Sequence, residues 1–188
     1  MTEADLAHFG PWTEEEFLAL DRTTNRIELV DGGLWVSPGP GMHHQGISYQ
    51  LHAALRPAAR AAGLLTFEGI NVRLEPGTIY VPDLTVIDAR TELDAYVEAS
   101  DTVLIAEILS PSSRKMDRVT KRHAYAAAKI AWYLLVEPDL STYAGVSLWL
   151  FRLDGDEYVE ASAAKRGETL HSDEPFPIAL RTNDLLAR

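Results

Sequence analysis

The segment that most constrains the fold is the apolar run VLIAEIL, which extends from Val103 to Leu109. Apolar residues occupy both sets of alternating positions, a pattern typical of a strand buried on both faces of a covered sheet. Glu107 interrupts the run. A carboxylate buried there is costly unless a cation meets it. The segment therefore predicts a central covered strand and raises the question of what lies opposite Glu107.

The composition predicts a folded chain of the soluble class. Its 188 residues are 46% hydrophobic and include no cysteine, so disulfides and zinc–thiolate sites are excluded. We expect one domain over residues 1–188, with an N-terminal helical segment (1–25) and a C-terminal β extension (139–188). The first ten residues lack the pattern of a secretory signal, and the apolar runs are too short to span a bilayer. The expected location is the cytoplasm, without a membrane partner.

The net charge of −11 disfavours a chain that binds nucleic acid over its whole surface. Phosphate groups are bound mainly by Lys and Arg. A local basic patch or a bound metal ion can nevertheless invert the sign of the potential at one site. Any nucleic-acid partner must therefore be held locally.

The remaining patterns predict a mixed sheet flanked by helices, an α+β (α/β) fold class. The DGG turn at 31–33 predicts an N-terminal hairpin, and Pro57 is expected to kink or split a helix that ends near Gly63. The turn DGD at 154–156 predicts a late antiparallel pair. The run 146–153 contains several large residues that we expect to be exposed, so a homodimer is one expectation.

Two carboxylates lie in positions suited to chemistry. Pro82 marks an edge, a start or a bulge of the strand that follows it, so Asp83 should project from the ladder. If this strand neighbours the one carrying Glu107, both carboxylates reach one point. One of them then holds a proton, or a divalent cation joins them, and Mg²⁺ suits oxygen ligands of this kind.

A basic helix face follows the central strand. Arg114, Arg118 and Arg122 recur at a spacing of four residues, which places them on one face of an α-helix, with Lys121 near the same face. Such a face would supply an otherwise acidic protein with a local positive field. It predicts a phosphate-binding surface.

The order of these motifs resembles the Uma-type family of restriction-endonuclease-like proteins, within the PD-(D/E)XK nuclease superfamily. The segments that carry the resemblance lie between Arg26 and Pro138. They read RIELVDGGLWVSPGP, HQ, PDLTV, AEILSPSS, D…K…Y and YLLVEP. The resemblance implies a restriction-endonuclease-like fold and a phosphodiesterase, an endonuclease dependent on Mg²⁺ or Mn²⁺, with DNA favoured over RNA as substrate.

The resemblance also implies roles for individual residues. Asp83, Glu107 and the backbone carbonyl of Ile108 would be metal ligands. The superfamily's usual lysine would stand two residues after the Glu, where this chain has Leu109, and Lys121 would replace it as the group that assists the attacking water. Glu28 and His44 would belong to a possible additional part of the site.

Each of these residues has a structural alternative. Asp83 could end a turn, Glu107 could pair with an Arg of the next helix, and Lys121 could be a solvated helix residue. Glu28 could face outward from its strand, and His44 could be a core histidine.

At the level of function, the alternatives are a catalytically weak or inactive module of the same fold that binds nucleic acid or a protein, and a metal-free hydrolase with an acid/base pair. The missing lysine at Leu109 and the net charge of −11 favour the inactive module.

Overall fold

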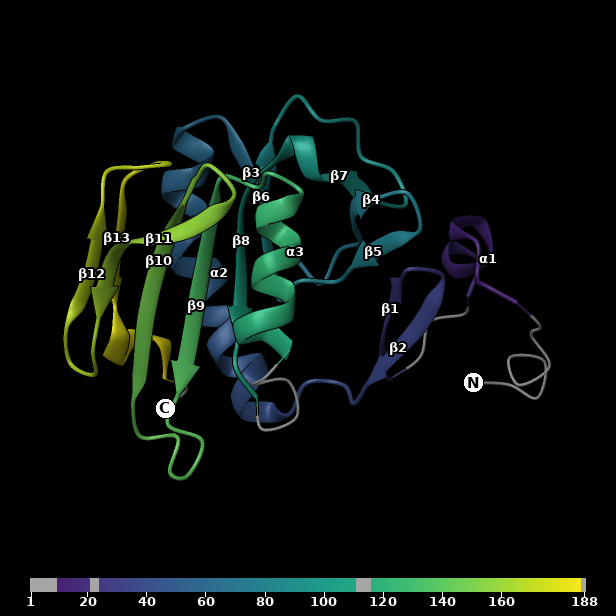
Figure 1. The fold of residues 1–188 in the computed structure, drawn as a ribbon. Coiled ribbons are helices and arrows are strands. Elements are labelled where there is room, and N and C mark those ends of the chain that lie inside the picture. The colour runs from purple at the N-terminus through teal and green to yellow at the C-terminus, as the bar shows by residue number, and fades with distance from the viewer. Residues whose placement is uncertain (1–9, 21–23, 111–115, 187–188) are drawn as a thin grey trace.

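The computed structural model describes residues 10–20, 24–110 and 116–186 (Figure 1). A six-stranded sheet forms the centre, in the order β11-β10-β9-β8-β6-β3, with β8 and β9 parallel and the other neighbours antiparallel. The mixed sheet predicted from the apolar runs is confirmed. Its strands are β3 (Leu64–Glu68), β6 (Leu84–Asp88), β8 (Thr102–Ile108), β9 (Trp132–Pro138), β10 (Val146–Asp154) and β11 (Glu157–Ala164).

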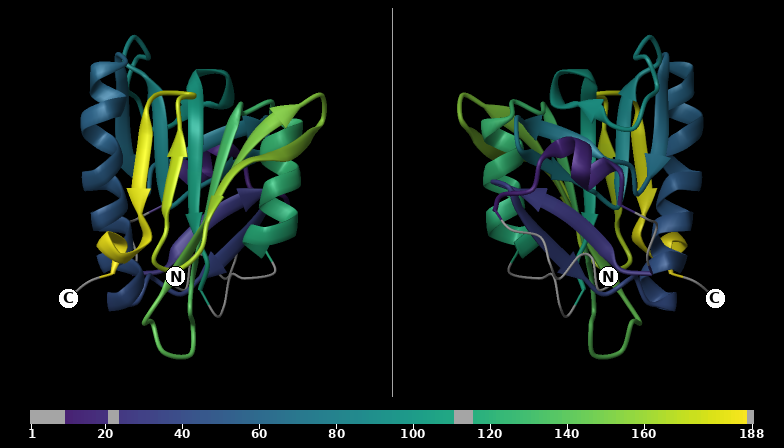
Figure 2. Two further views of the ribbon diagram at one scale, coloured as in Figure 1. Left: turned by 90° about the vertical axis from the view of Figure 1, so that its left-hand side faces the viewer. Right: turned by 90° about the vertical axis from the view of Figure 1, so that its right-hand side faces the viewer.

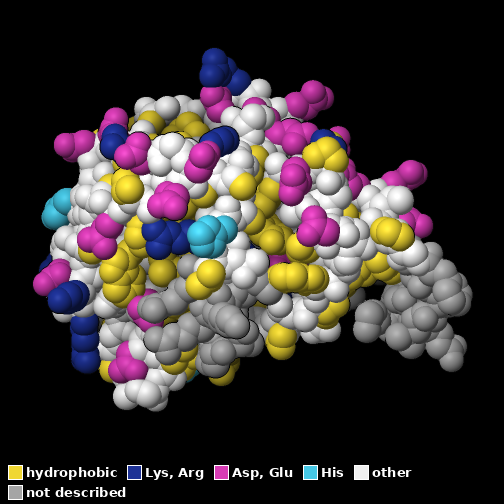
Figure 3. Space-filling model, viewed as in Figure 1, with side chains coloured by type: hydrophobic (Ala, Val, Ile, Leu, Met, Phe, Trp, Pro, Cys, Tyr) yellow, Lys and Arg dark blue, Asp and Glu magenta, His cyan; other side chains and the backbone are white. Residues whose placement is uncertain are grey.

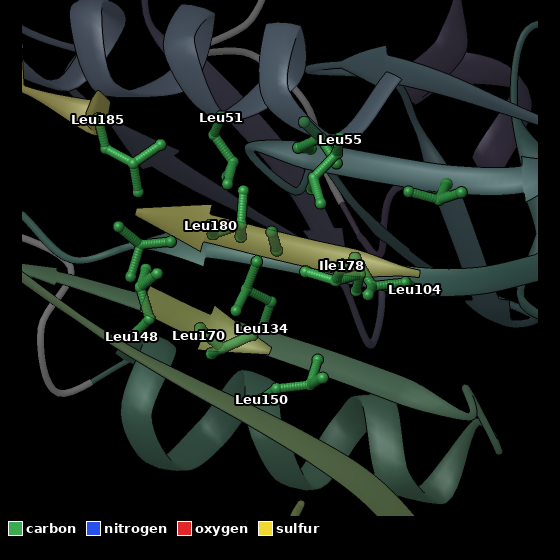
Figure 4. Packing of buried hydrophobic residues seen from close by; sticks show 14 of the residues in the cluster. Leu51, Leu55, Leu104, Leu134, Leu148, Leu150, Leu170, Ile178, Leu180 and Leu185 are labelled. Carbon is green, nitrogen blue, oxygen red and sulfur yellow. The ribbon is translucent and has the colours of Figure 1, made fainter. Parts of the chain in front are cut away.

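Helices cover both faces of this sheet, as Figure 2 shows. On one face, α2 (Met42–Ala61) packs with the β12–β13 hairpin (Thr169–Ser172 and Ile178–Arg181) and the turn η4 (Thr182–Leu185). Figure 4 shows leucines of the helix, hairpin and sheet meeting in this apolar layer. On the other face lies α3 (Arg122–Ala127), which directly follows the π-helix η3 (Met116–Lys121). Burial on both faces explains why the central strands are apolar throughout.

A second, five-stranded sheet lies beside the first and has the order β2-β1-β5-β4-β7. Its strands are β1 (Arg26–Val30), β2 (Gly33–Ser37), β4 (Val72–Glu75), β5 (Thr78–Tyr80) and β7 (Val97–Glu98). The predicted hairpin is confirmed, because β1 and β2 pair with a two-residue turn at Asp31 and Gly32, both of which have positive φ. The short helices α1 (Glu14–Leu18) and η2 (Ala99–Asp101) complete the elements.

The expectation that Pro57 splits its helix is wrong, because α2 is one continuous helix, and the alternative expectation of a kink stays a prediction. Its apolar stripe of Ile47, Leu51 and Leu55 holds it against the sheet. Pro57 is exposed, and so is Ala53, whose carbonyl loses its helical donor. Water can therefore solvate that carbonyl, and packing outweighs the lost hydrogen bond.

The expected exposure of 146–153 is also wrong. These residues belong to β10, which lies inside the sheet between β9 and β11, and most of its large side chains are buried. The antiparallel pairing of β10 with β11 around the turn is confirmed. The homodimer stays a prediction, and the exposure of residues 146–153 no longer supports it.

Truncation at the centre of the sheet should be costly. Leu104 is fully buried between the two helical layers. We expect Leu104→Ala to lower the free energy of unfolding by about 2–5 kcal/mol, through lost burial and a residual cavity. Urea denaturation would measure this, with Leu93→Ala as the control because Leu93 is 58% exposed. Equal stability of the two variants would contradict the packing described.

Candidate active site

Asp83 and Glu107 come together at one end of the central sheet. Pro82 and Asp83 immediately precede β6, so the proline stands at a strand start. The register pairs Leu84 with Ala106, which places Asp83 across from Glu107. The Ile108 N–H donates a hydrogen bond of 2.7 Å to Asp83 Oδ2. The two strands are therefore neighbours, which was the condition for both carboxylates to reach one point.

Asp83 is almost completely buried and is held as a carboxylate. Arg26 Nη2 lies 2.6 Å from its Oδ1, and His44 Nε2 lies 3.1 Å from its Oδ2. Burial by itself raises the pKa of Asp83, but the hydrogen bond from His44 and the charge of Arg26 outweigh it and hold that pKa well below the usual range. An ionised carboxylate only accepts hydrogen bonds, so His44 carries its proton on Nε2.

Lys121 is the cation that meets Glu107. Its Nζ lies 3.1 Å from Glu107 Oε1 and 2.8 Å from Glu28 Oε1, and it faces the ring of Tyr80. Lys121 is 3% exposed, so the alternative of a solvated helix residue is wrong. Tyr125 also donates a 2.6 Å hydrogen bond to Glu107 Oε1.

The Tyr125 hydroxyl is a permanent donor in this network. Burial and the negative charge of Glu107 and Glu28 raise the pKa of Tyr125 well above its usual value. The hydroxyl is therefore protonated at neutral pH. It fixes one oxygen of Glu107 beside the Lys121 ammonium group.

Glu28 connects the two sheets. It is 4% exposed, so the alternative of an outward-facing strand residue is wrong. Its Oε1 accepts the N–H of Val81 at 2.9 Å as well as facing Lys121. Since Val81 lies two residues before Asp83, Glu28 also helps to position the segment that carries Asp83.

Arg122 makes its contacts away from the cavity. Its guanidinium lies 4.1 Å from the Phe151 ring and donates to the Tyr158 carbonyl at 2.6 Å. Arg114 and the side chain of Arg118 lie outside the described residues.

A cavity of about 290 Å³ opens onto this cluster. Its wall includes four of the residues singled out from the sequence, Glu28, His44, Asp83 and Lys121, together with Ile108. Glu107 is fully buried behind the wall. The cavity lies where β6 begins and β8 ends, at the lower end of the sheet in Figure 1.

Sequence reasoning missed two residues of the cluster. Arg26 lines the cavity and lies in the field of all three carboxylates, which raise its pKa against the opposing effect of burial. The pattern that could have indicated Arg26 is its position two residues before Glu28. In a strand, this spacing places both side chains on one face. Tyr125 lies four residues after Lys121, one helical turn on.

The donor set was tested for a divalent cation. Within the described ranges, no group of three or more His, Asp and Glu side chains is placed to hold a metal ion. The oxygen donors of Asp83, Glu107 and the Ile108 carbonyl suit Mg²⁺, which usually takes one or two carboxylates plus water and substrate phosphate. Counted at their ordinary charges at pH 7, the three carboxylates and the two cations Arg26 and Lys121 leave one formal negative charge. By chemistry and formal charge the residues fit a divalent cation that takes the places of the Arg26 and Lys121 contacts.

A covered mixed sheet with paired acidic residues at its strand ends and a lysine from the neighbouring helix is the arrangement that the resemblance to restriction-endonuclease-like proteins implied. A family model, Uma2, described as "Putative restriction endonuclease", matches residues 14–186, and the chain belongs to that family. The resemblance noted in the sequence is therefore confirmed.

A solved structure shares the fold. The crystal structure of a "putative nuclease belonging to DUF820" from Anabaena variabilis superposes with a TM-score of 0.73 at 18% identity, over 93% of this chain and 97% of that one. No curated protein matches the chain. None of the described helices is long and apolar enough to cross a membrane.

The buried state of Asp83 predicts a pH dependence of stability. Its pKa is lower in the folded chain than in the unfolded one, where it is about 4. The ionised Asp83 side chain therefore stabilises the folded state fully above the pKa of the unfolded chain. This stabilisation is lost progressively as the pH falls from there towards the lower pKa of the folded chain. We expect Asp83→Asn to be less stable than the wild type by roughly 1–3 kcal/mol at pH 7, with the difference shrinking towards pH 3. Urea unfolding at both pH values would test this, and parallel pH profiles would contradict it.

Proposed function

We propose that this protein is a metal-dependent phosphodiesterase that cleaves nucleic acid at the cavity beside Asp83. The observation that carries the proposal is the convergence of Asp83, Glu107, Glu28 and Lys121 at one end of the sheet. Membership of a family described as "Putative restriction endonuclease" supports it.

Asp83 and Glu107, with the carbonyl of Ile108, would hold Mg²⁺ or Mn²⁺. The ion would lower the pKa of a bound water and stabilise the charge that develops on the phosphate. Lys121 would orient the attacking water or stabilise that charge with its ammonium group. Glu28 and Tyr125 act as positioning residues, because they hold Lys121 and Glu107 in place.

Arg26 would meet the substrate phosphate at the cavity, and the predicted phosphate-binding face of Arg114, Arg118 and Arg122 stays a prediction. Arg26 lines the cavity and its side chain is 21% exposed, so it can exchange Asp83 for a phosphate oxygen. Its guanidinium offers paired donors that suit phosphate geometry. Acidic side chains are spread over the face seen in Figure 3, which agrees with a substrate held locally.

Cleavage should depend on the buried cluster. In the presence of Mg²⁺ or Mn²⁺, we expect Asp83→Ala and Lys121→Met each to lower the rate of cleavage of DNA or RNA by about 10²–10⁴-fold. Asp88→Ala is the matched control, since Asp88 lies on the same strand and pairs with Arg90 outside the cavity. Equal cleavage by wild type and Asp83→Ala would identify a contaminant and refute the proposal.

A second candidate is a non-catalytic module of the same fold. Leu109 fills the usual lysine position and is buried in the core, and the carboxylates are already met by protein cations. Metal binding separates the two candidates. Titration calorimetry with Mg²⁺ should give heat for the wild type and none for Glu107→Gln. If the wild type binds nucleic acid but shows no cation site, the module is the better description.

A further inference from the structure

Two aromatic rings from distant parts of the chain meet at the cavity. His43 lies in the first turn of α2, and Tyr143 lies in the loop between β9 and β10. Their ring centroids are 4.3 Å apart and their planes differ by 9°. Both residues line the same cavity as Asp83 and Lys121. Figure 1 shows the start of α2 and this loop at the same end of the molecule.

The backbone of Tyr143 is held in an uncommon conformation. Its φ of 51° lies in the left-handed region, which bulky residues rarely adopt. The Tyr143 N–H donates to the Asp139 carbonyl at 2.7 Å. The Asp139 carboxylate accepts hydrogen bonds from Ser141 and Thr142, which lower its pKa to about 2. The loop is therefore built to present this ring, and strain of this kind is concentrated at functional sites.

The surroundings of the stack are apolar and open. His43 is exposed and Tyr143 is half-exposed. Trp35 also lines the cavity, and Met42 next to the stack is 87% exposed. Aromatic and apolar side chains thus lie on the same cavity wall as the catalytic cluster. A flat ligand group could pack on the stack while an adjoining phosphate reaches Arg26.

We propose that the His43–Tyr143 stack is a platform for an unpaired nucleobase of the substrate, so that the site takes single-stranded nucleic acid. This inference rests on the proposed function and names its substrate class. Every base has a π face and stacks on aromatic rings without sequence readout. Within a duplex the neighbouring pairs cover those faces.

The net negative charge of the chain also favours single-stranded nucleic acid as the substrate. Phosphate contacts give most of the affinity of duplex binders, and a net charge of −11 leaves little of it here. Stacking does not depend on charge. It can therefore supply affinity that this protein cannot take from a basic surface.

The test measures binding without cleavage. The full chain is titrated, in EDTA, with a single-stranded DNA oligonucleotide that carries 2-aminopurine, and with its duplex. The wild type should bind the single strand more tightly and quench the fluorescence of the base. Tyr143→Asn removes the ring, and Asn tolerates positive φ. It should weaken single-strand binding by about 5- to 100-fold and abolish the quenching. Tyr49→Ala, an exposed tyrosine of α2 outside the cavity, should leave both unchanged.

Three results would overturn the platform: unchanged binding by a folded Tyr143→Asn, equal weakening for single strand and duplex, or no binding of nucleic acid by the wild type. If Tyr143→Asn does not melt like the wild type, His43→Gln replaces it with the same expectation. The two proposals fail separately. Cleavage that depends on Asp83 but not on Tyr143 would leave the phosphodiesterase without the platform. Quenching that depends on Tyr143, without cleavage in Mg²⁺ or Mn²⁺, would leave the platform without the phosphodiesterase.

Discussion

The ammonium group of Lys121 holds the site together. It lies between the carboxylates of Glu28 and Glu107, which belong to different sheets. Each carboxylate is buried, so neither would stay ionised at low cost without a cation beside it. The five-stranded sheet, the central sheet and the π-helix therefore meet at this ammonium group. The cavity opens at the same junction.

A second group of charged residues lies on the cavity wall, beside aromatic side chains. Arg26 and His44 hold Asp83 from the side of the hairpin and the side of α2. The same two elements place Trp35 and His43 on the wall, so charge and aromatic surface come together. An acidic protein can in this way present the guanidinium of Arg26 and flat rings at one opening. Nucleic acid would be recognised there by local chemistry.

Much of the arrangement follows from short patterns. The apolar runs determined which strands are central, and the Pro-Asp pair marked where β6 starts. The meeting of Asp83 with Glu107 was predicted only on the condition that their strands are neighbours, and the antiparallel register of β6 and β8 meets that condition. The expectation that Pro57 splits its helix failed for a physical reason, because packing against the sheet holds that helix together.

The sequence by itself determined the covered mixed sheet, the hairpin and the buried carboxylates, because each depends on local periodicity or turn chemistry. Only the tertiary structure decided which cations meet those carboxylates. Arg26, His44 and Lys121 come from three separate elements, and no spacing along the chain relates them to Asp83 or Glu107. The stack of His43 on Tyr143 is of the same kind, since its rings are 100 positions apart and meet only when α2 and the β9–β10 loop reach the same end of the sheet.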